Sequence, residues 1–314
     1  MANKEIVIVM GYPASGKSTT VQQFVDKGYT RLNRDSVGGS MEQLDRLAEK
    51  TLLDTNLLVL DNLYPSVESR KSIIALAKRN KIPIRCYMMG TSMEDSMLNA
   101  CLRMMRKHGC IPDPKRFGEV KDPNTFPVAV IYKYRKEFQQ PTVKEGFDQI
   151  IIVPFVRTWG PDFTNKAILV DYDGTLRLSA GKQKFPILKE DIKMMPGRAE
   201  VLKRYKAKGY LVLGVSNQSG VAKGQLTFAE CKQRFIDTNE MLGKGIVDEF
   251  SFCPHAVPPI SCYCRKPNAG IGAFYIHQHK LRPSECIMVG DMGSDKTFAA
   301  RCGFQYVDAN EFFK

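Results

Sequence analysis

The sequence predicts an α/β protein made of two consecutive domains, and three observations predict this class. At 314 residues, the chain is longer than a typical single domain. Short apolar runs rich in β-branched residues alternate with stretches of helical spacing, as in parallel sheets covered by helices. The segment WGPDFTN, residues 159–165, then breaks this alternation with Gly and Pro. We therefore expect one domain over 1–160 and another over 166–314.

The predicted elements form one series on each side of this boundary. The first series contains the expected strands EIVIVM (5–10), LLVL (57–60), IPIRCYMM (82–89) and QIIIV (149–153), with helical spacing over 66–79 and 92–107. The second contains the expected strands KAILV, YLVLGV, EFSFC and CIMVG, with helices near 197–208, 227–241, 268–279 and 294–302. Each series predicts its own parallel sheet.

The first apolar run ends at a glycine loop, which makes it too short for a signal-peptide core or a membrane span. Nine cysteines form an odd count without a small secreted framework, so reduced thiols are favoured over disulfides. We therefore expect an intracellular, cytoplasmic protein with no membrane partner.

The formal net charge of the chain is +13, and part of the excess is local. Residues 101–144 hold 10 Lys and Arg against 4 Asp and Glu. A basic surface suits a polyanion such as nucleic acid, because contacts to backbone phosphates release counterions. The alternative is a basic surface that only keeps the protein in solution.

The clearest motif of the first domain is GYPASGKST, which fits the pattern G-x-x-x-x-G-K-[ST] between a predicted strand and a predicted helix. In such a loop the backbone amides wrap phosphates, Lys17 reaches the β and γ phosphates, and Ser18 supplies an oxygen to Mg²⁺. The motif therefore predicts an ATP site. Its expected residues are Gly11, Ser15, Gly16, Lys17, Ser18 and Thr19.

An acceptor alcohol needs a base, and Asp35 in LNRDSVGG is the candidate, with a helix N-cap as the alternative role. Asp61 closes LLVLDN, where it could help to hold magnesium or simply serve as a turn residue at the strand end. Asn99, Arg103 and Arg106 share a face of the helix expected over 92–107. One of these arginines could close over the γ phosphate, or both could be solvated surface charges.

These segments, together with YKYRKEFQQPTVKEGFDQIIIVPF (132–155), resemble the kinase domain of polynucleotide 5′-kinase/3′-phosphatases over most of residues 5–158. The resemblance implies Lys17 and Ser18 for ATP and Mg²⁺, Asp35 as the base on a 5′-hydroxyl, and Arg103 as the lid arginine. The sequence departs from the family where Asn99 and Cys101 stand in place of a further upstream arginine.

The second domain opens with VDYDGTL, in which Asp171 and Asp173 follow a predicted strand. Two adjacent acids can divide the chemistry of a phosphatase: Asp171 attacks phosphorus, while Asp173 protonates the leaving oxygen and then activates water. Ser216 in GVSNQSG and Lys266 in CRKP would grip the phosphoryl oxygens. Mg²⁺ is expected on Asp171, Asp173 and Asp291, the last of which lies in VGDMGSD with Asp295. Taken singly, each residue could be a cap, a surface lysine or a turn aspartate.

Between these segments lies CPHAVPPISCYC, which spaces three cysteines and a histidine as C-x-H-x6-C-x-C. Three thiolates and one imidazole suit a closed tetrahedral zinc site that stiffens a Pro-rich loop. Buried free thiols or redox cysteines are the alternatives. The expected Zn²⁺ ligands are Cys253, His255, Cys262 and Cys264.

In this order the motifs resemble the haloacid dehalogenase phosphatase superfamily. The strings CPH, CYCRKP and SNQSGVAKG are similar to its zinc-containing histidinol-phosphate and heptose-bisphosphate phosphatase branch. In that branch the zinc orders the loop that bears the lysine and takes no part in the chemistry. The kinase-first order resembles phage-type end-healing enzymes.

The combination predicts a bifunctional enzyme that heals DNA or RNA ends, phosphorylating a 5′-hydroxyl with ATP and hydrolysing a 3′-phosphate through an aspartyl phosphate. Such ends are substrates of a ligase, so a functional link to one is implied. One alternative is a kinase and phosphatase for a small sugar or nucleoside phosphate. Another is a nucleic-acid-binding adaptor with decayed centres, which the intact catalytic side chains disfavour.

Overall fold

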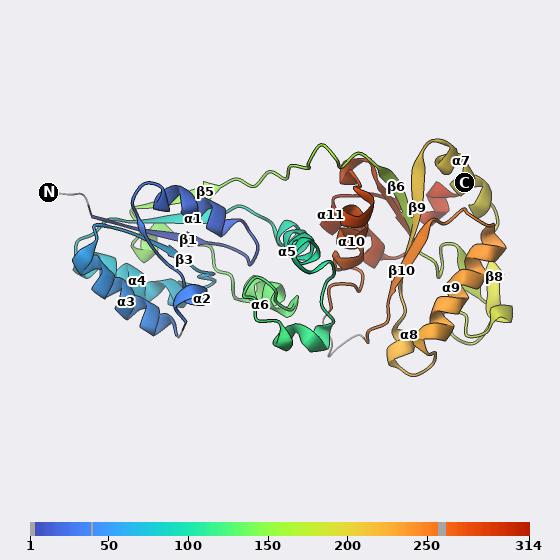
Figure 1. The fold of residues 1–314 in the computed structure, drawn as a ribbon, viewed down its shortest axis with the longest axis horizontal. Helices are drawn as coiled ribbons and strands as arrows, with labels where there is room; N and C mark the ends of the chain where they lie inside the picture. The colour runs from blue at the N-terminus through green and yellow to red at the C-terminus, as the bar shows by residue number, and fades with distance from the viewer. Residues whose placement is uncertain (1–3, 39, 257–261) are drawn as a thin grey trace. The chain divides into compact units, whose positions relative to one another are not determined.

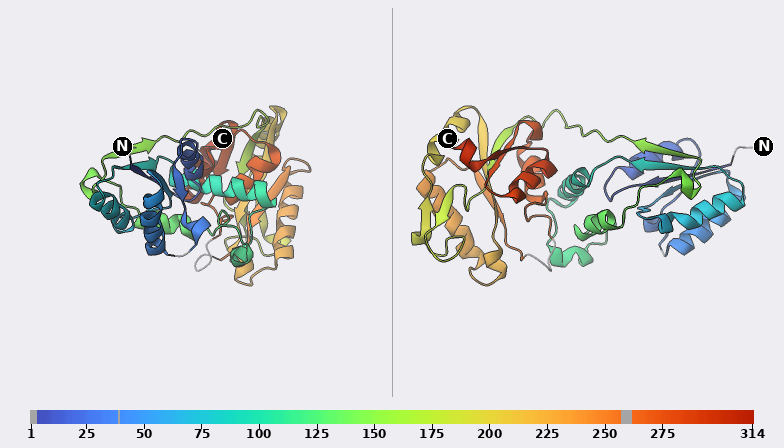
Figure 2. Two further views of the ribbon diagram at one scale, coloured as in Figure 1. Left: turned by 60° about the vertical axis from the view of Figure 1, so that its left-hand side comes forward. Right: turned by 180° about the vertical axis from the view of Figure 1, so that it is seen from behind.

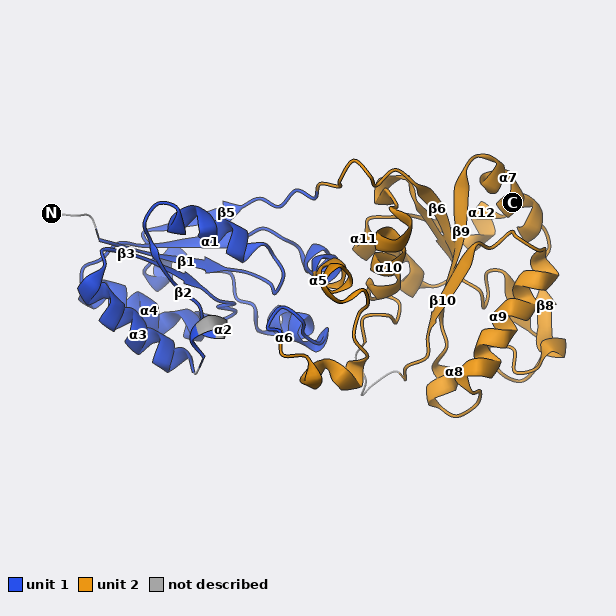
Figure 3. Cartoon of the chain, viewed as in Figure 1, with its two compact units in different colours: residues 1–99, 122–157 blue, residues 100–121, 158–314 orange. Residues whose placement is uncertain are grey.

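The structure is a computed structural model, and it describes residues 4–38, 40–256 and 262–314. Its chain divides into two compact units, unit 1 over residues 1–99 and 122–157 and unit 2 over residues 100–121 and 158–314 (Figure 3). The division along the chain falls near the expected boundary, while residues 100–121 are grouped with unit 2. As limits of the two functional domains, residues 1–160 and 166–314 stay a prediction.

Unit 1 is built on one parallel sheet with the strand order β2-β3-β1-β4-β5 (Figure 1). Its strands are β1 Glu5–Met10, β2 Thr30–Leu32, β3 Leu57–Asp61, β4 Ile84–Met89 and β5 Gln149–Val153. Its helices are α1 Lys17–Val25, α2 Arg34–Val37, α3 Met41–Asp54, α4 Val67–Arg79, the first part of α5 Met93–His108, α6 Ala129–Glu137 and η2 Val143–Glu145.

The apolar strand β1 is the centre of this unit because both of its faces are covered. Ile6, Ile8 and Met10 pack with residues of α3 and α4, and all three are fully buried. Val7 and Val9 point to the other face, where they pack against α1. A side chain of this size contributes about 1.5–3 kcal/mol when it is fully buried. Since the carboxyl end of β1 leads directly into the glycine loop, the core holds that loop in place.

Unit 2 contains a second parallel sheet, with the order β10-β9-β6-β11-β12, and the antiparallel pair β7-β8. Its strands are β6 Lys166–Val170, β7 Arg177–Ser179, β8 Ile192–Met194, β9 Tyr210–Asn217, β10 Glu249–Cys253, β11 Ile287–Gly290 and β12 Gln305–Asp308. Its helices are the end of α5, η1 Pro114–Glu119, η3 Lys189–Asp191, α7 Arg198–Ala207, α8 Ser219–Ala222, α9 Phe228–Leu242, α10 Gly270–His279, η4 Pro283–Glu285, α11 Gly293–Cys302 and α12 Ala309–Phe312.

Helices cover both faces of this second sheet, with α7 and α9 on one side and α10 and α11 on the other (Figures 1 and 2). On the α7 and α9 side, Ile168 and Val170 of β6 belong to one core cluster with Leu202 and Phe235. Helix α9 begins at a capping box in which Thr227 and Glu230 satisfy each other's backbone amides. Strands β9, β6 and β11 are parallel neighbours in this sheet, so their carboxyl ends lie at the same edge of it.

The α/β prediction with two parallel sheets is confirmed, and each strand and helix expected from the sequence is present within a few residues. In the part of the chain that the structure describes, no helix is long and apolar enough to cross a membrane. The intracellular compartment stays a prediction.

Candidate active sites and metal centres

The glycine loop of unit 1 joins β1 to α1 in a conformation that depends on two glycines. Gly11 has φ +150°, and a Cβ atom there would lie 2.8 Å from Cβ of Met89. Gly16 precedes α1 with φ +93°, so the helix starts without a side-chain cap. Its first amides are thereby left to a ligand rather than to a capping side chain, which is the arrangement that binds phosphate at a helix N-terminus.

Side chains around the loop fix its shape. The Lys17 ammonium donates to the carbonyl oxygens of Gly11 at 3.1 Å and Tyr12 at 2.8 Å, so it lies folded along the loop. Asn99 of α5 donates to the carbonyl oxygen of Ala14 at 3.0 Å, and Thr91 donates to that of Ser15 at 2.8 Å. Gly11, Ser15 and Gly16 lie in the loop between β1 and α1, and Lys17, Ser18 and Thr19 form the first turn of α1; their role in binding ATP stays a prediction. Asn99 was expected only on the face of the helix over 92–107 that carries Arg103 and Arg106, and its hydrogen bond to this loop has no signal in the sequence.

Asp35 and Asp61, the two acidic residues expected near the phosphate acceptor, lie after β2 and at the end of β3. The backbone of Asp35 lies in the short helix α2, and its side chain lies outside the described part of the structure, so its role as base stays a prediction. Asp61 is buried at the end of β3 and pairs with Arg31 of the neighbouring strand β2. Asn33 donates to the carbonyl oxygen of Asp61 at 2.6 Å, which ties the segment before Asp35 to the end of β3.

Arg103 belongs to the part of α5 that is grouped with unit 2. Its side chain is half-buried, and its positive charge partly opposes the rise in the pKa of Tyr263 that burial causes. Arg103 therefore lies near the loop that carries Cys262 and Cys264. A role for Arg103 as a lid over the γ phosphate stays a prediction.

In unit 2, the predicted nucleophile and its lysine come together at the carboxyl ends of the strands. Asp171 directly follows β6 and is 6% exposed. The buried ammonium of Lys266 donates to Asp171 Oδ1 at 2.6 Å and to the Val215 carbonyl oxygen at 2.8 Å, and it lies 2.7 Å from Asp295 Oδ1. Ser216 is buried beside them at the end of β9. The structure thus unites Asp171, Ser216 and Lys266 from three segments of the sequence.

Three carboxylates crowd into this pocket. One oxygen each of Asp171, Asp291 and Asp295 lies within 4.8 Å of the others. Burial raises the pKa of Asp171 to about 7, with Asp295 and Asp173 adding to the shift and Lys266 opposing it. Burial also raises the pKa of Asp291. One ammonium against three carboxylates leaves excess negative charge, so the donor set fits a hard divalent cation such as Mg²⁺.

The group of three contains Asp295 and not Asp173, and a role for Asp173 in holding Mg²⁺ stays a prediction. Asp173 accepts hydrogen bonds from Arg177 Nε at 2.8 Å and from Gln218 Nε2 at 2.6 Å, and neither partner was expected from the sequence. The sequence offered one sign that Gln218 belongs to the site, because Gln218 lies in the SNQSG segment with Ser216. Arg177 directly follows the motif VDYDGTL but carries no such sign. Gly174 allows Asp291 to approach, because a Cβ atom at Gly174 would lie 2.3 Å from Asp291 Oδ2.

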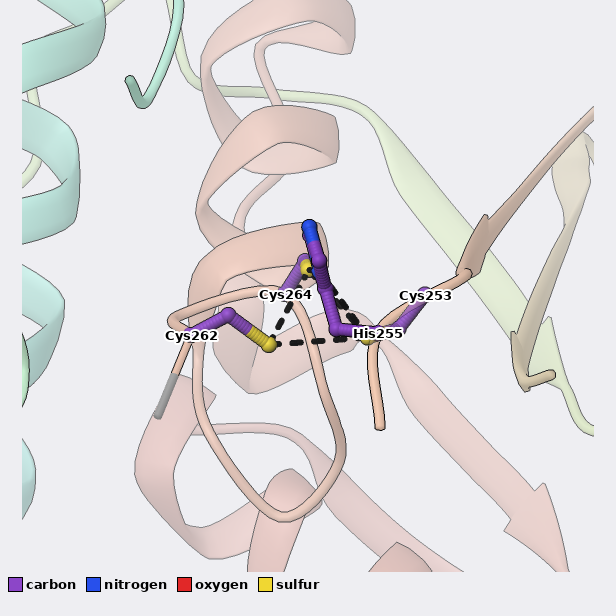
Figure 4. A group of neighbouring side chains, drawn as sticks. All are labelled: Cys253, His255, Cys262 and Cys264. Carbon is purple, nitrogen blue, oxygen red and sulfur yellow. Dashed lines mark hydrogen bonds between the residues drawn. The ribbon is translucent and has the colours of Figure 1, made fainter. Parts of the chain in front are cut away.

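The four predicted zinc ligands also converge (Figure 4). The sulfur atoms of Cys253, Cys262 and Cys264 are 3.3–3.5 Å apart, and His255 Nδ1 lies 3.2 Å from the Cys264 sulfur. Four ligands at the usual zinc distances have neighbouring ligand atoms about 3.5–3.8 Å apart, so the observed separations are slightly shorter than those around one central ion, which a small outward shift of the side chains would accommodate. His255 Nε2 faces Asp113 Oδ2 at 3.5 Å, a carboxylate partner of the kind that orients histidine ligands.

A family model described as polynucleotide kinase 3 phosphatase matches residues 166–313. A D-glycero-beta-D-manno-heptose-1,7-bisphosphate 7-phosphatase of Helicobacter pylori is 34% identical over 135 residues, which are 42% of this chain and 76% of that protein. Over the part that matches, the chain belongs to the family of that heptose-bisphosphate phosphatase. Its phosphatase half carries the pocket around Asp171 and the Cys/His cluster.

Two further similarities extend to proteins named for nucleic-acid end processing or RNA repair. The bifunctional polynucleotide phosphatase/kinase of Schizosaccharomyces pombe is 33% identical over 154 residues, 49% of this chain and 34% of that protein. The chain thus spans about a third of the length of that relative. A chain in the structure of the Pnkp1/Rnl/Hen1 RNA repair complex is 18% identical, with a TM-score of 0.35, over 98% of this chain and 97% of that one. The resemblance to a phosphatase-family domain fused to a P-loop domain, inferred from the motifs, is confirmed.

Proposed function

We propose that the protein heals nucleic-acid ends: unit 1 transfers the γ phosphate of ATP to a 5′-hydroxyl, and unit 2 hydrolyses a 3′-phosphate. The observation that carries the proposal is the coexistence of two phosphate sites in one chain. One is the glycine loop at Lys17, and the other is the buried Asp171 and Lys266 pair within the region matched by the polynucleotide kinase 3 phosphatase model. The two reactions address different positions, so neither reverses the other.

The phosphatase reaction follows from the roles of three side chains. Asp171 attacks phosphorus and forms an aspartyl phosphate as the bond to the ester oxygen breaks, and Asp173 gives that oxygen its proton. Water then attacks phosphorus, its proton passes to Asp173, and the bond to Asp171 breaks to release phosphate. Lys266 binds the phosphoryl oxygens and offsets their charge. Magnesium at Asp171, Asp291 and Asp295 would neutralise charge on the same group.

In unit 1, the loop amides and Lys17 would hold the ATP phosphates, with Ser18 turned to Mg²⁺. Asp35 would accept the proton of the attacking 5′-hydroxyl, and Arg103 would act as the lid arginine. Zinc at Cys253, His255, Cys262 and Cys264 would order the loop before Lys266 and take no part in the chemistry.

The proposal extends to partners. A 5′-phosphate and a 3′-hydroxyl are the ends that a ligase joins, so the product of this protein would be a ligase substrate. The basic stretch 101–144 would form part of the strand-binding surface in an intracellular protein.

A second candidate is a small sugar phosphate as the substrate of unit 2. The 34% identity to a heptose-bisphosphate phosphatase favours it. The test is an oligonucleotide with a 5′-hydroxyl and a 3′-phosphate, incubated with ATP and Mg²⁺ while both ends are analysed, in parallel with a sugar bisphosphate. We expect both oligonucleotide ends to change. Turnover confined to the sugar phosphate would reject nucleic-acid end healing.

A further inference from the structure

Both oxygens of the Asp173 carboxylate are held by buried side chains. Arg177 Nε donates to Asp173 Oδ1 at 2.8 Å, and Gln218 Nε2 donates to Asp173 Oδ2 at 2.6 Å. Arg177 and Gln218 are each 1% exposed, whereas the Asp173 side chain is 18% exposed. The carboxylate therefore keeps an open side while its orientation is fixed from within the protein.

Arg177 is itself immobilised by α9. Its Nη1 donates to the carbonyl oxygen of Arg234 at 2.8 Å and to Thr238 Oγ1 at 2.5 Å. Its guanidinium also lies 4.8 Å from the ring centre of Phe235 and 5.4 Å from that of Tyr172. An arginine clamped on these sides holds the carboxylate in a nearly fixed place.

Gln218 differs from Arg177 in what it can exchange with a carboxyl group. A guanidinium only donates, so Asp173 Oδ1 remains an acceptor in both protonation states. A carboxamide has a donor and an acceptor, so after a turn about its last bond it can accept a hydrogen bond from a protonated Asp173. Because the guanidinium keeps Oδ1 as an acceptor, the proton of the acid form sits on Oδ2, where Gln218 can accept it until the leaving oxygen of the substrate takes that place. Gln218 Nε2 also donates to Ser216 Oγ at 2.9 Å, which places Oδ2 on the side of the phosphate-binding serine.

We propose that Arg177 and Gln218 are positioning residues for Asp173, which direct its proton to Oδ2 and toward the leaving oxygen. This inference rests on the proposed phosphatase function. In the first step the proton moves from Oδ2 to the ester oxygen as that oxygen leaves phosphorus and Asp171 bonds to it. In the second step the attacking water returns a proton to Oδ2 as the bond between Asp171 and phosphorus breaks. The proton count is restored after each turnover.

The test varies how much the leaving group needs that proton. The alkoxide from a 3′-phosphorylated oligonucleotide leaves poorly without a proton, whereas p-nitrophenolate leaves without one. We expect Arg177→Met and Gln218→Leu to slow the first-turnover release of the oligonucleotide leaving group by roughly 10²-fold, the usual lower bound for general acid catalysis. The first-turnover release of p-nitrophenolate should change by less than about threefold, because that step uses no proton. Arg177→Lys keeps one hydrogen-bond donor and should restore part of the first-turnover rate that Arg177→Met loses with the oligonucleotide.

Arg301→Met is the matched control, since Arg301 is a buried arginine of unit 2 that donates to Asn268 Oδ1 at 2.8 Å. Any loss that this variant causes should be equal with both substrates. Equal losses with both substrates for Arg177→Met and Gln218→Leu, or wild-type rates with both, would overturn the positioning role. If Arg177→Met fails to fold, Gln218→Leu and Arg177→Lys carry the same comparison. If the wild type hydrolyses glycerol phosphate but not the oligonucleotide, the proposed function fails, and glycerol phosphate replaces the oligonucleotide in the comparison.

Discussion

Replacing Lys266 by methionine should destabilise unit 2 and remove the phosphatase activity proposed for it. The ammonium is buried and contacts Asp171 and Asp295 as well as the Val215 carbonyl oxygen. Methionine fills a similar volume but leaves both buried carboxylates without their positive neighbour. Breaking a buried ion pair from one side costs about 3–5 kcal/mol, because the remaining charge is left uncompensated or, at Asp171 with its pKa raised to about 7, has to be cancelled by taking up a proton.

That cost can be expressed as a change in melting temperature. In a unit of roughly 150–250 residues, 1 kcal/mol corresponds to about 2–4 °C, so the unit 2 transition should fall by roughly 6–20 °C. The assay is scanning calorimetry at neutral pH in buffer without magnesium and without chelator, so that bound zinc is retained. Added Mg²⁺ should restore part of the loss, since it binds the folded carboxylate group and replaces the missing positive charge.

Lys203→Met is the control, because Lys203 is exposed on α7 and surface substitutions usually change stability by no more than about 0.5 kcal/mol. A Lys266→Met protein whose unit 2 melts within about 1 °C of the wild type, with no response to Mg²⁺, would refute the argument that this ammonium compensates the two carboxylates.

Three further predictions concern the separate sites. Lys17→Ala should lower kinase turnover at least about 10²-fold and spare 3′-phosphatase activity, and Asp171→Asn should do the reverse. Both activities can be followed with one oligonucleotide that is labelled at both ends. Loss of both activities in either variant would contradict independent sites. Protein purified without chelator should hold close to one zinc per chain by elemental analysis, and Cys262→Ser should lose most of it together with thermal stability of unit 2; an unchanged zinc content would remove Cys262 from the ligand set. Oligonucleotide binding should weaken as salt rises, with a slope set by the number of phosphate contacts, and a salt-independent affinity would count against the basic stretch 101–144 as a binding surface.

Much of the fold could be predicted because the local pattern and the tertiary environment agree. Strands such as β1 and β6 are buried on both faces of parallel sheets, so they appear in the sequence as continuous apolar runs. Elements whose pattern is weak were missed. Strand β2 has only three residues and two of them are exposed, and the pair β7-β8 is equally short. Helix α3 was also missed, although Ser40 and Gln43 form a capping box at its start.

Motif residues could be found because their chemistry depends on spacing along the chain. Gly11, Gly16 and Lys17 lie in one loop, and Asp171 and Asp173 follow one strand. The Cys/His spacing predicted the convergence of the four ligand atoms in the same way. These parts of the sites were determined by the sequence alone.

The tertiary structure decided which residues surround those motifs. Asp295 lies beside Asp171 because β6 and β11 are neighbours in the sheet, and Gln218 reaches Asp173 because β9 flanks β6 on its other side. Arg177 reaches Asp173 from a buried position that α9 creates, and Asp113 meets His255 across 142 positions of the chain. Such contacts depend on the order of strands in the sheet and on packing between elements, which the local periodicity of a sequence does not predict. The sequence by itself therefore determined the reacting groups, and the tertiary structure decided which side chains position them.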